Sequence, residues 1–248
     1  MLAESFVEEI KNEKNVLVER MLNGQILCRP KFGNKTQTIK IPLEITPDLS
    51  FLCGVIVGDG HLWKTRRRIG IEMTRKDILE MILKKFNNVF DISLKLKEKH
   101  DKRINRKPTW RIDFENKAIW LLFSRVFEIP VGKKSDIVKA PKLVMRNLDC
   151  MKMFFSGLFL ADGGRKGNRI SFTTSSSGLF DNVQTILNTF DINFFTRKWV
   201  HNKSKRLVFD IIISRKSDIN KFMEIFPLIR IKFKGCNVIK PICSAGVS

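Results

Sequence analysis

Two aspartates of this chain each close an apolar stretch and precede a glycine. Asp59 ends the run FLCGVIVGD, and Asp162 ends the run FFSGLFLAD, 162 − 59 = 103 residues later. Two carboxylates that lie close together repel each other, which raises a pKa or demands a cation. Carboxylate and backbone carbonyl oxygens are hard ligands that suit Mg²⁺. The pair therefore predicts a divalent-metal site, provided that the fold brings the two acids together.

The segments that lead to the acids are expected to be helices. Thr46 before Pro47 is typical of a helix start, and Asn147 can cap the second helix. Gly60 and Gly163 follow the acids directly, and we expect them to take the left-handed conformation that ends many helices. Because a helix C-terminus is already partly negative, acids placed there add to the need for a cation.

Small residues recur at a spacing of four in both helices. Gly54 and Gly58 lie on one face of the first helix, and Gly157 and Ala161 lie on the matching face of the second. Such faces let two helix backbones approach closely, because no side chain holds them apart. Near-symmetric packing of the two helices would bring both acids to the same end. A lone Asp-Gly would do no more than end a helix, whereas a matched pair favours chemistry.

The chain continues in the same order after each motif, which predicts an α+β fold. Each copy is expected to form αββαββα, with antiparallel strands such as SLKLKEK and TWRIDFE in the first and NFFTRKWVH and RLVFDIIIS in the second. These strands alternate apolar with basic residues, as in a half-buried sheet. We expect an N-terminal extension at 1–46, a first repeat at 47–140 and a second repeat at 141–248, with a linker at 128–147.

The first 46 residues match neither copy. A helix is expected in ESFVEEIKNEK and a hairpin in QILCRPKFGNKTQTIKI, turning at Gly33 and Asn34. The extension is interpreted as structural, with a DNA-contacting arm as the alternative.

The composition favours a polyanionic partner. The 248 residues carry 46 Lys and Arg against 25 Asp and Glu, a net charge of +21, and 43% of them are hydrophobic, which is enough for a sizeable core. Nucleic acid is the expected partner. A membrane surface is the alternative, but the sequence has no long apolar run. Five cysteines without a CxxC pair argue against a zinc site and suit a reducing compartment.

LCGVIVGDG (52–60) and FSGLFLADG (155–163) resemble the two motifs of the monomeric, double-motif LAGLIDADG homing endonucleases. The segment PVGKKSDIVKAP is also similar to the stretch before the second motif in that family. The resemblance covers about residues 47 to 235. It implies a pseudo-symmetric αββαββα pair whose antiparallel sheets form a saddle on duplex DNA. It also implies a monomer that cleaves both strands of a long target site with Mg²⁺, in the cytoplasm or an organellar matrix.

Site residues carry over from the resemblance one by one. Asp59 and Asp162 match the catalytic, metal-binding acids, and Gly58 and Ala161 match positions whose carbonyls can join the metal. The resemblance also implies a basic residue near the scissile phosphates, for which the candidates are Arg75, Lys76 and Arg165. Candidates for DNA contacts, taken from the basic strands and their flanks, are Lys64, Arg66, Arg68, Lys95, Lys97, Lys99, Arg111, Arg165, Arg169, Arg197, Lys198, His201 and Arg206.

Two other functions use the same fold. A maturase would hold intron RNA to assist splicing, with its acids intact. A DNA-binding regulator would have lost cleavage, and the two intact acids argue against it. The chain starts at Met1 without a nucleophile and ends CSAGVS without a terminal Asn, so we expect no intein.

Overall fold

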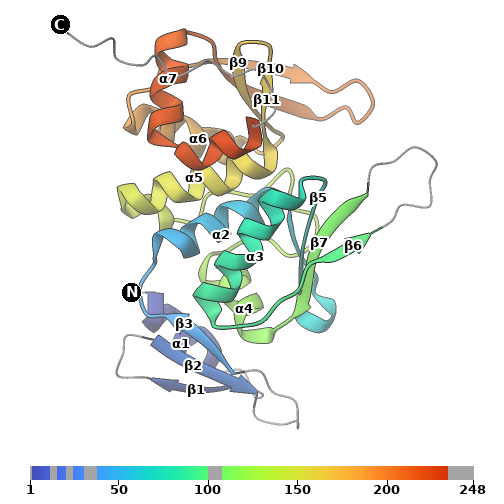
Figure 1. Ribbon diagram of the computed structural model, residues 1–248, viewed down its shortest axis with the longest axis vertical. Coiled ribbons are helices and arrows are strands. Elements are labelled where there is room, and N and C mark those ends of the chain that lie inside the picture. Colours follow the sequence, from blue (N-terminus) through green and yellow to red (C-terminus); the bar gives the residue numbers. More distant parts are fainter. Residues whose placement is uncertain (1, 12–15, 21–24, 31–37, 100–107, 234–248) are drawn as a thin grey trace, which may run out of the picture.

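The computed structural model describes residues 2–11, 16–20, 25–30, 38–99 and 108–233. Its strands form three antiparallel sheets, of which two belong to a duplicated unit and one to the N-terminal extension. Figure 1 shows the two copies stacked along the long axis, with helices α2 and α5 side by side between them.

The duplicated unit has the predicted order in both copies. The first copy consists of α2 (Pro47–Val57), β4 (Gly60–Leu62), η1 (Thr65–Arg67), β5 (Arg68–Met73), α3 (Lys76–Phe90), β6 (Lys97–Lys99), β7 (Thr109–Glu115), α4 (Lys117–Leu121) and the π-helix η2 (Leu122–Val126). The second copy consists of α5 (Leu148–Asp162), β8 (Gly163–Lys166), β9 (Arg169–Thr174), α6 (Ser177–Thr189), β10 (Phe195–Val200), β11 (Leu207–Ile213), α7 (Lys216–Ile225) and the 3-10 helix η4 (Pro227–Phe233). The sheets, β4-β5-β7-β6 and β8-β9-β11-β10, correspond strand for strand, which confirms the predicted α+β class.

The segment between the copies contains the short 3-10 helix η3 (Val144–Arg146) and no strand. This irregular stretch coincides with the predicted linker, and the boundaries of the extension and of the two repeats stay predictions. The extension contains α1 (Leu2–Lys11), β1 (Val16–Arg20), β2 (Gln25–Pro30) and β3 (Ile39–Pro42). β2 and β3 pair antiparallel, as the hairpin prediction requires, while the turn at Gly33 and Asn34 lies outside the described residues.

Both predicted helix starts are confirmed. The Thr46 hydroxyl accepts a hydrogen bond from the Leu49 amide at 3.1 Å, and the Asn147 side chain accepts from the Asp149 amide at 2.9 Å. Each cap satisfies a backbone donor that the first turn of a helix leaves open.

The expected left-handed glycines after the acids are wrong. Gly163 has φ −71°, and the glycines with positive φ in the described chain are Gly132 and Gly167. Space explains the glycines instead. A Cβ on Gly60 would lie 2.4 Å from the Ile56 Cα, and one on Gly163 would lie 2.4 Å from the Phe159 ring. The chain turns tightly back over the preceding helical turn, and no side chain fits there.

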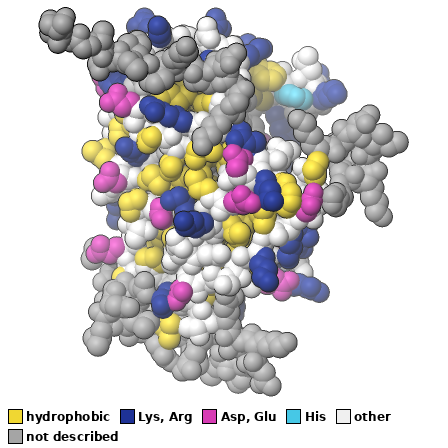
Figure 2. Space-filling view, viewed as in Figure 1, with side chains coloured by type: hydrophobic (Ala, Val, Ile, Leu, Met, Phe, Trp, Pro, Cys, Tyr) yellow, Lys and Arg dark blue, Asp and Glu magenta, His cyan; other side chains and the backbone are white. Residues whose placement is uncertain are grey.

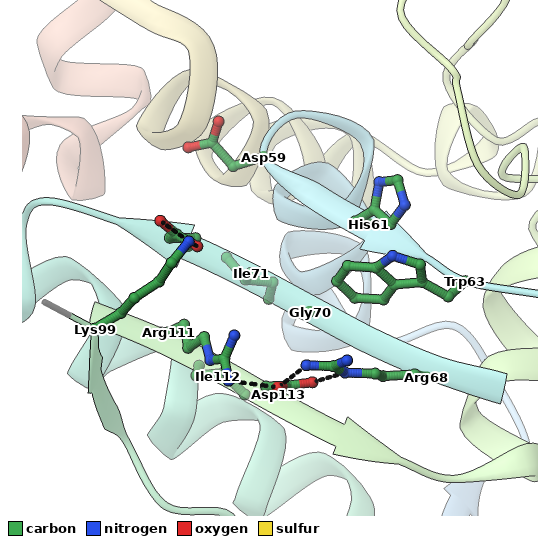
Figure 3. A pocket seen from close by; sticks show the side chains of 11 residues that line it. Asp59, His61, Trp63, Arg68, Gly70, Ile71, Lys99, Arg111, Ile112 and Asp113 are labelled. Carbon is green, nitrogen blue, oxygen red and sulfur yellow. Dashed lines mark hydrogen bonds and ion pairs between the residues drawn. The ribbon is translucent and has the colours of Figure 1, made fainter. Parts of the chain in front are cut away.

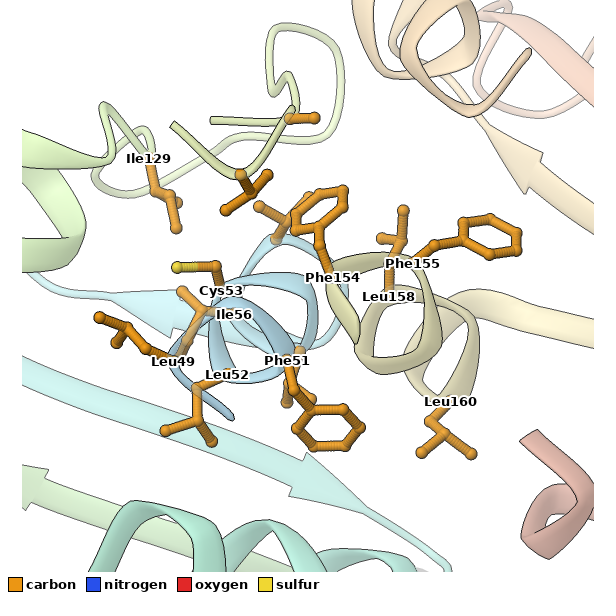
Figure 4. Close-up of a cluster of buried hydrophobic side chains, with 14 of the residues drawn as sticks. Leu49, Phe51, Leu52, Cys53, Ile56, Ile129, Phe154, Phe155, Leu158 and Leu160 are labelled. Atoms are coloured by element: carbon orange, nitrogen blue, oxygen red, sulfur yellow. The ribbon is translucent and has the colours of Figure 1, made fainter. Parts of the chain in front are cut away.

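The two motif helices touch through their glycines. A Cβ on Gly54 would lie 1.9 Å from the Phe154 carbonyl oxygen, and one on Gly157 would lie 2.1 Å from the Phe51 carbonyl oxygen. Phe51 and Phe154 are themselves 103 residues apart, so the contact repeats with the symmetry of the motifs. Figure 4 shows α2 and α5 in this close approach, with buried apolar side chains around them. The predicted small-residue interface is confirmed.

Each sheet buries one face beneath helices and leaves the other open. In the first sheet Ile69, Ile71 and Ile112 are buried, and in the second Ile170, Phe172 and Ile211 are buried. The neighbouring residues along each strand point to the opposite side, which we call the open face. Within the described residues, no helix has the length and hydropathy needed to span a membrane.

The contact between α2 and α5 predicts a large cost for a single methyl group. Gly54→Ala should destabilise the protein by about 1–3 kcal/mol or more, because the obstacle is a backbone carbonyl that cannot rotate away. Urea unfolding would measure the loss. Gly164→Ala is the control, because its Cβ would meet only the Ser171 hydroxyl at 3.7 Å. Equal stability of the two variants would contradict the close approach.

Candidate active site

The two acids lie together at one end of the paired helices. Asp59 follows the last turn of α2, and Asp162 is the last residue of α5. A Cβ on Gly58 would lie 3.2 Å from a carboxylate oxygen of Asp162 and 2.4 Å from the Cβ of Ala161. The Asp162 carboxylate of the second copy therefore lies against the helix end of the first. The small residue at position 58 makes this proximity possible.

The acids act on each other electrostatically. The pKa of Asp162 is raised to about 6, first by desolvation and then by repulsion from Asp59. Desolvation also raises the pKa of Asp59. Both residues are exposed as a whole, but the surrounding protein withdraws their carboxylates in part from water. Two partly desolvated carboxylates at negative helix ends are a site with unmet need for positive charge.

Two lysines supply part of that charge, and the first of them is Lys134 in the linker. Its ammonium group donates hydrogen bonds to the carbonyl oxygen of Gly58, at 2.7 Å, and to that of Ile56. Desolvation lowers the pKa of Lys134 to about 8, although the charges of Asp162 and Asp59 oppose the shift. With a pKa of about 8, the Lys134 ammonium is still mostly protonated at neutral pH and releases its proton more readily than an ordinary lysine.

The second lysine, Lys232 in η4, does the same for α5. Its ammonium group donates to the carbonyl oxygens of Phe159 at 3.1 Å, Leu160 at 2.8 Å and Ala161 at 2.9 Å. Desolvation lowers its pKa, against the charges of Asp59 and Asp162. The two helix ends are thus capped in the same way by cations from separate segments.

Sequence reasoning missed both lysines. The repeat spacing was the signal that could have found them, since 134 − 59 = 75 and 232 − 162 = 70. Two lysines that follow their acids at nearly the same distance are expected to have the same role, one in each half of the site. The three predicted basic residues, Arg75, Lys76 and Arg165, do not act on the acids in this way and stay predictions.

The donor set suits a hard divalent cation. The carboxylates of Asp59 and Asp162 and the carbonyls of Gly58 and Ala161 all offer oxygen. Both carbonyls already accept from lysines, so a metal ion would use their second lone pair. In the described chain no group of three or more His, Cys, Asp and Glu gathers that could hold a metal. The remaining ligands would therefore be water and substrate oxygens.

The open face of the first sheet leads away from Asp59 as a hollow of about 340 Å³ (Figure 3). Arg68 forms a two-pronged ion pair with Asp113, and Arg111 lies 3.3 Å from the same carboxylate. The Arg68 guanidinium carbon stacks on the ring of Trp63, 4.9 Å from the ring centroid, and the same ring packs directly against Gly70. Asp113 therefore fixes two arginines whose remaining donors face the hollow.

The open face of the second sheet also has an acid that binds neighbouring side chains, but at a register position that does not correspond to Asp113. Asp210 accepts hydrogen bonds from Arg197 at 2.9 Å, from the Trp199 indole at 2.9 Å and from Thr173 at 2.8 Å. Asp210 pairs in register with Thr173, whereas the corresponding pair of the first sheet is Arg111 with Glu72. An acid of the second sheet thus stands where the first sheet has a base.

The other predicted DNA contacts fall into three groups. Lys97 and Lys99 share the open face with Arg111, which Lys97 opposes in register. Arg169, Lys64, Arg66 and Lys95 lie at strand ends and in loops near the open faces. The third group points away from the open faces or is engaged by other parts of the chain. Lys198 and Arg165 lie on the helix-covered side of the second sheet, where they oppose buried Phe209 and Ile170. The Arg206 guanidinium lies 3.6 Å from the Asp136 carboxylate of the linker, and the His201 ring accepts a hydrogen bond from the Ser204 amide. Figure 2 shows Lys and Arg side chains distributed along the molecule, over both repeats.

Comparison with known proteins agrees with this geometry. Residues 149–227 match the family model described as a LAGLIDADG-like domain. The homing endonuclease I-DmoI, in a study of mesophilic variants, superposes with a TM-score of 0.54 at 16% identity, over 73% of this chain and 96% of that one. The homing endonuclease I-WcaI, bound to its DNA recognition sequence, gives a TM-score of 0.52 at 19% identity, over 75% and 83%.

The protein has the two-motif LAGLIDADG fold. The predicted resemblance is confirmed at this level. The N-terminal LAGLIDADG domain of DUF199/WhiA also shares the fold, with a TM-score of 0.51 at 16% identity over 73% of this chain and 80% of that one. The fold alone therefore does not distinguish between functions.

Two curated relatives come from Methanocaldococcus jannaschii. The replication factor C small subunit is 27% identical over 220 residues, which is 87% of this chain and 11% of that protein. The glutamine–fructose-6-phosphate aminotransferase is 27% identical over 164 residues, which is 63% of this chain and 14% of that protein. The chain therefore spans little more than a tenth of either relative. The expectation that it is no intein stays a prediction.

The charges around Asp59 and Asp162 predict opposite pKa shifts for two substitutions. In metal-free buffer, Asp59→Asn should lower the Asp162 pKa below about 6, since it removes the repelling charge. Lys134→Met should raise the Asp162 pKa, since it removes an attracting charge. Carboxyl carbon NMR titration measures both. Shifts of the same sign would contradict the arrangement.

The same pKa predicts a dependence of stability on pH. The folded Asp162 holds its proton up to about pH 6, whereas an unfolded aspartate releases it near about pH 4. The native state therefore binds more protons between these values, and the free energy of unfolding should fall as pH rises through them. Asp162→Asn should lack this part of the decline. A wild-type profile parallel to that of the variant would contradict the raised pKa.

Proposed function

We propose that this protein is a site-specific homing endonuclease that makes a double-strand break in a long DNA target, with a divalent cation, Mg²⁺, as cofactor. The observation that supports it best is the mutual placement of Asp59 and Asp162. Two acids that repel each other at negative helix ends, flanked by two sheets with basic open faces, suit the binding of metal and phosphate.

Each residue group has a distinct role in this proposal. Asp59 and Asp162, with the carbonyls of Gly58 and Ala161, would hold the metal. Bound there, the metal would activate a water and stabilise the leaving oxygen of the phosphodiester. Lys134 and Lys232 neutralise part of the negative charge of the phosphates as they approach the acids. Desolvation lowers the pKa of both lysines, and at Lys134 it lowers the pKa to about 8.

The two open faces would position the DNA. Lysines and arginines contact phosphates and set the register, and fixed arginines such as Arg68 can read guanine edges. Because Asp113 and Asp210 hold their partners before DNA arrives, little side-chain freedom is lost on binding. A monomer with two unequal faces suits a target whose halves differ. The compartment would be reducing, either cytoplasm or an organellar matrix, since cysteines 28, 53 and 150 are free and buried.

Cleavage is the direct test. Selection of bound duplexes from a random library supplies a target, and incubation with Mg²⁺ should then give one defined cut that EDTA abolishes. Asp162→Asn should slow cleavage by more than about a hundredfold. It should preserve or tighten binding, because one repelling charge is lost. Asp149→Asn, an exposed acid at the other end of α5, is the matched control and should cleave normally.

The alternatives predict different outcomes. Tight, specific DNA binding without cleavage in Mg²⁺ or Mn²⁺ would contradict the nuclease and favour a regulator. Preference for a structured intron RNA over every selected duplex would favour a maturase.

Binding to the open faces predicts a steep salt dependence. The logarithm of affinity should fall by roughly 0.9 per neutralised phosphate for each tenfold rise in salt. Arg169→Gln should reduce this slope by about 1, because it removes one phosphate contact. Lys198→Gln, which removes a charge from the helix-covered side of the same sheet, should leave the slope unchanged. If the slope of the wild-type protein corresponded to only one or two neutralised phosphates, binding of a duplex across both open faces would be contradicted.

A further inference from the structure

Each of the two lysines is carried on a segment that the opposite repeat holds. Lys134 caps α2 of the first repeat, but the linker around it is bound to the second repeat. The Ser175 hydroxyl donates to the Ser135 carbonyl at 2.9 Å, and the Ser176 hydroxyl donates to the Val138 carbonyl at 2.5 Å. Both serines lie at the start of α6.

The second lysine has the reverse relation. Lys232 caps α5 of the second repeat, and Arg75 of the first repeat holds its backbone. The Arg75 guanidinium donates to the carbonyl oxygen of Lys232 at 3.1 Å and to that of Ile231 at 3.0 Å. The same guanidinium is held from behind by Asp77, at 2.8 and 2.6 Å.

These crossed contacts obey the symmetry of the repeats. Arg75 is the N-cap residue of α3, and Ser176 is the N-cap residue of α6, 176 − 75 = 101 positions later. The two lysines are 232 − 134 = 98 positions apart. In each repeat, therefore, the start of the helix after the second strand (α3 or α6) holds the segment whose lysine caps the motif helix of the other repeat. The hydrogen-bond donors differ between the two. Hydroxyl groups serve one side and a guanidinium serves the other.

We propose that Arg75 is a positioning residue for the second half of the active site, which it serves from the first repeat. Its planar guanidinium spans two successive carbonyls, and Asp77 fixes its direction. The backbone of η4 is thereby held where the Lys232 ammonium reaches three carbonyls at the end of α5. Loss of the clamp would let η4 open locally and withdraw the lysine. The role in cleavage rests on the proposed function, whereas the clamp itself does not.

Hydrogen exchange measured by mass spectrometry tests the clamp without DNA or metal. Arg75→Gln should speed exchange several-fold across residues 226–233 and leave residues 133–140 unchanged. Ser175→Ala should do the reverse. Arg75→Lys, which keeps the charge but cannot span both carbonyls, should fall between wild type and Arg75→Gln. Arg125→Gln, an exposed arginine on η2, is the matched control and should change neither segment. A response of both segments, or of neither, overturns the clamp.

Strand-specific cleavage tests the positioning. On a target labelled on both strands, Lys232→Met should slow the cut of one strand more than the other. Arg75→Gln should slow the same strand and accumulate nicked DNA, and Arg75→Lys should restore part of the second cut. Equal rates on both strands, in a variant whose η4 does open, would overturn the positioning role. A wild-type protein that binds DNA but never cleaves it would contradict the proposed function and leave the clamp untouched. The hydrogen-exchange result would then still show whether Arg75 holds η4.

Discussion

The contact between the backbones of α2 and α5 is the constraint on which the rest of the structure depends. Gly54 and Gly157 each face a carbonyl oxygen of the opposite helix at a distance that no side chain would allow. This approach brings the two helix ends together and so places Asp59 beside Asp162. The raised pKa of Asp162, the lysine caps and the orientation of the two sheets all follow from it. The apolar packing of α2 against α5 therefore offsets the unfavourable repulsion between the two carboxylates.

Local sequence signals were sufficient to predict the fold because most of them occur in both copies of the repeated unit. Helix starts at Thr46 and Asn147, the alternation in TWRIDFE and the spacing of small residues all depend on neighbours within one element. The glycines after the acids were misread, because sequence does not distinguish a need for positive φ from a need for space. At Gly163 the Phe159 ring decides the matter, and its position depends on tertiary packing.

The site residues that we predicted and the structure brings together lie inside the motifs. Lys134 and Lys232 approach the acids from a linker and from a short 3-10 helix, and each segment accepts hydrogen bonds from the repeat opposite to the helix end that its lysine caps. No helix or strand periodicity marks such segments, and their one signal in the sequence is the similar spacing of each lysine from its acid. Lys198 and Arg197 differ in the same way, because Arg197 lies on the open face while Lys198 lies over Phe209 on the helix-covered side, and the DNA contact of Lys198 stays a prediction. A shift of one position along a strand reverses the face.

The exchange of charge between the two sheets has a consequence for the symmetry of any target that both sheets contact. Arg111 with Glu72 in one sheet stands where Asp210 with Thr173 stands in the other. A protein with two identical halves would have one arrangement in both places and would suit an inverted repeat. Because the two halves differ here, a duplex bound across both open faces, as proposed above, would meet different groups in its two directions. Two copies of either half, joined back to back, would lose that sense of direction.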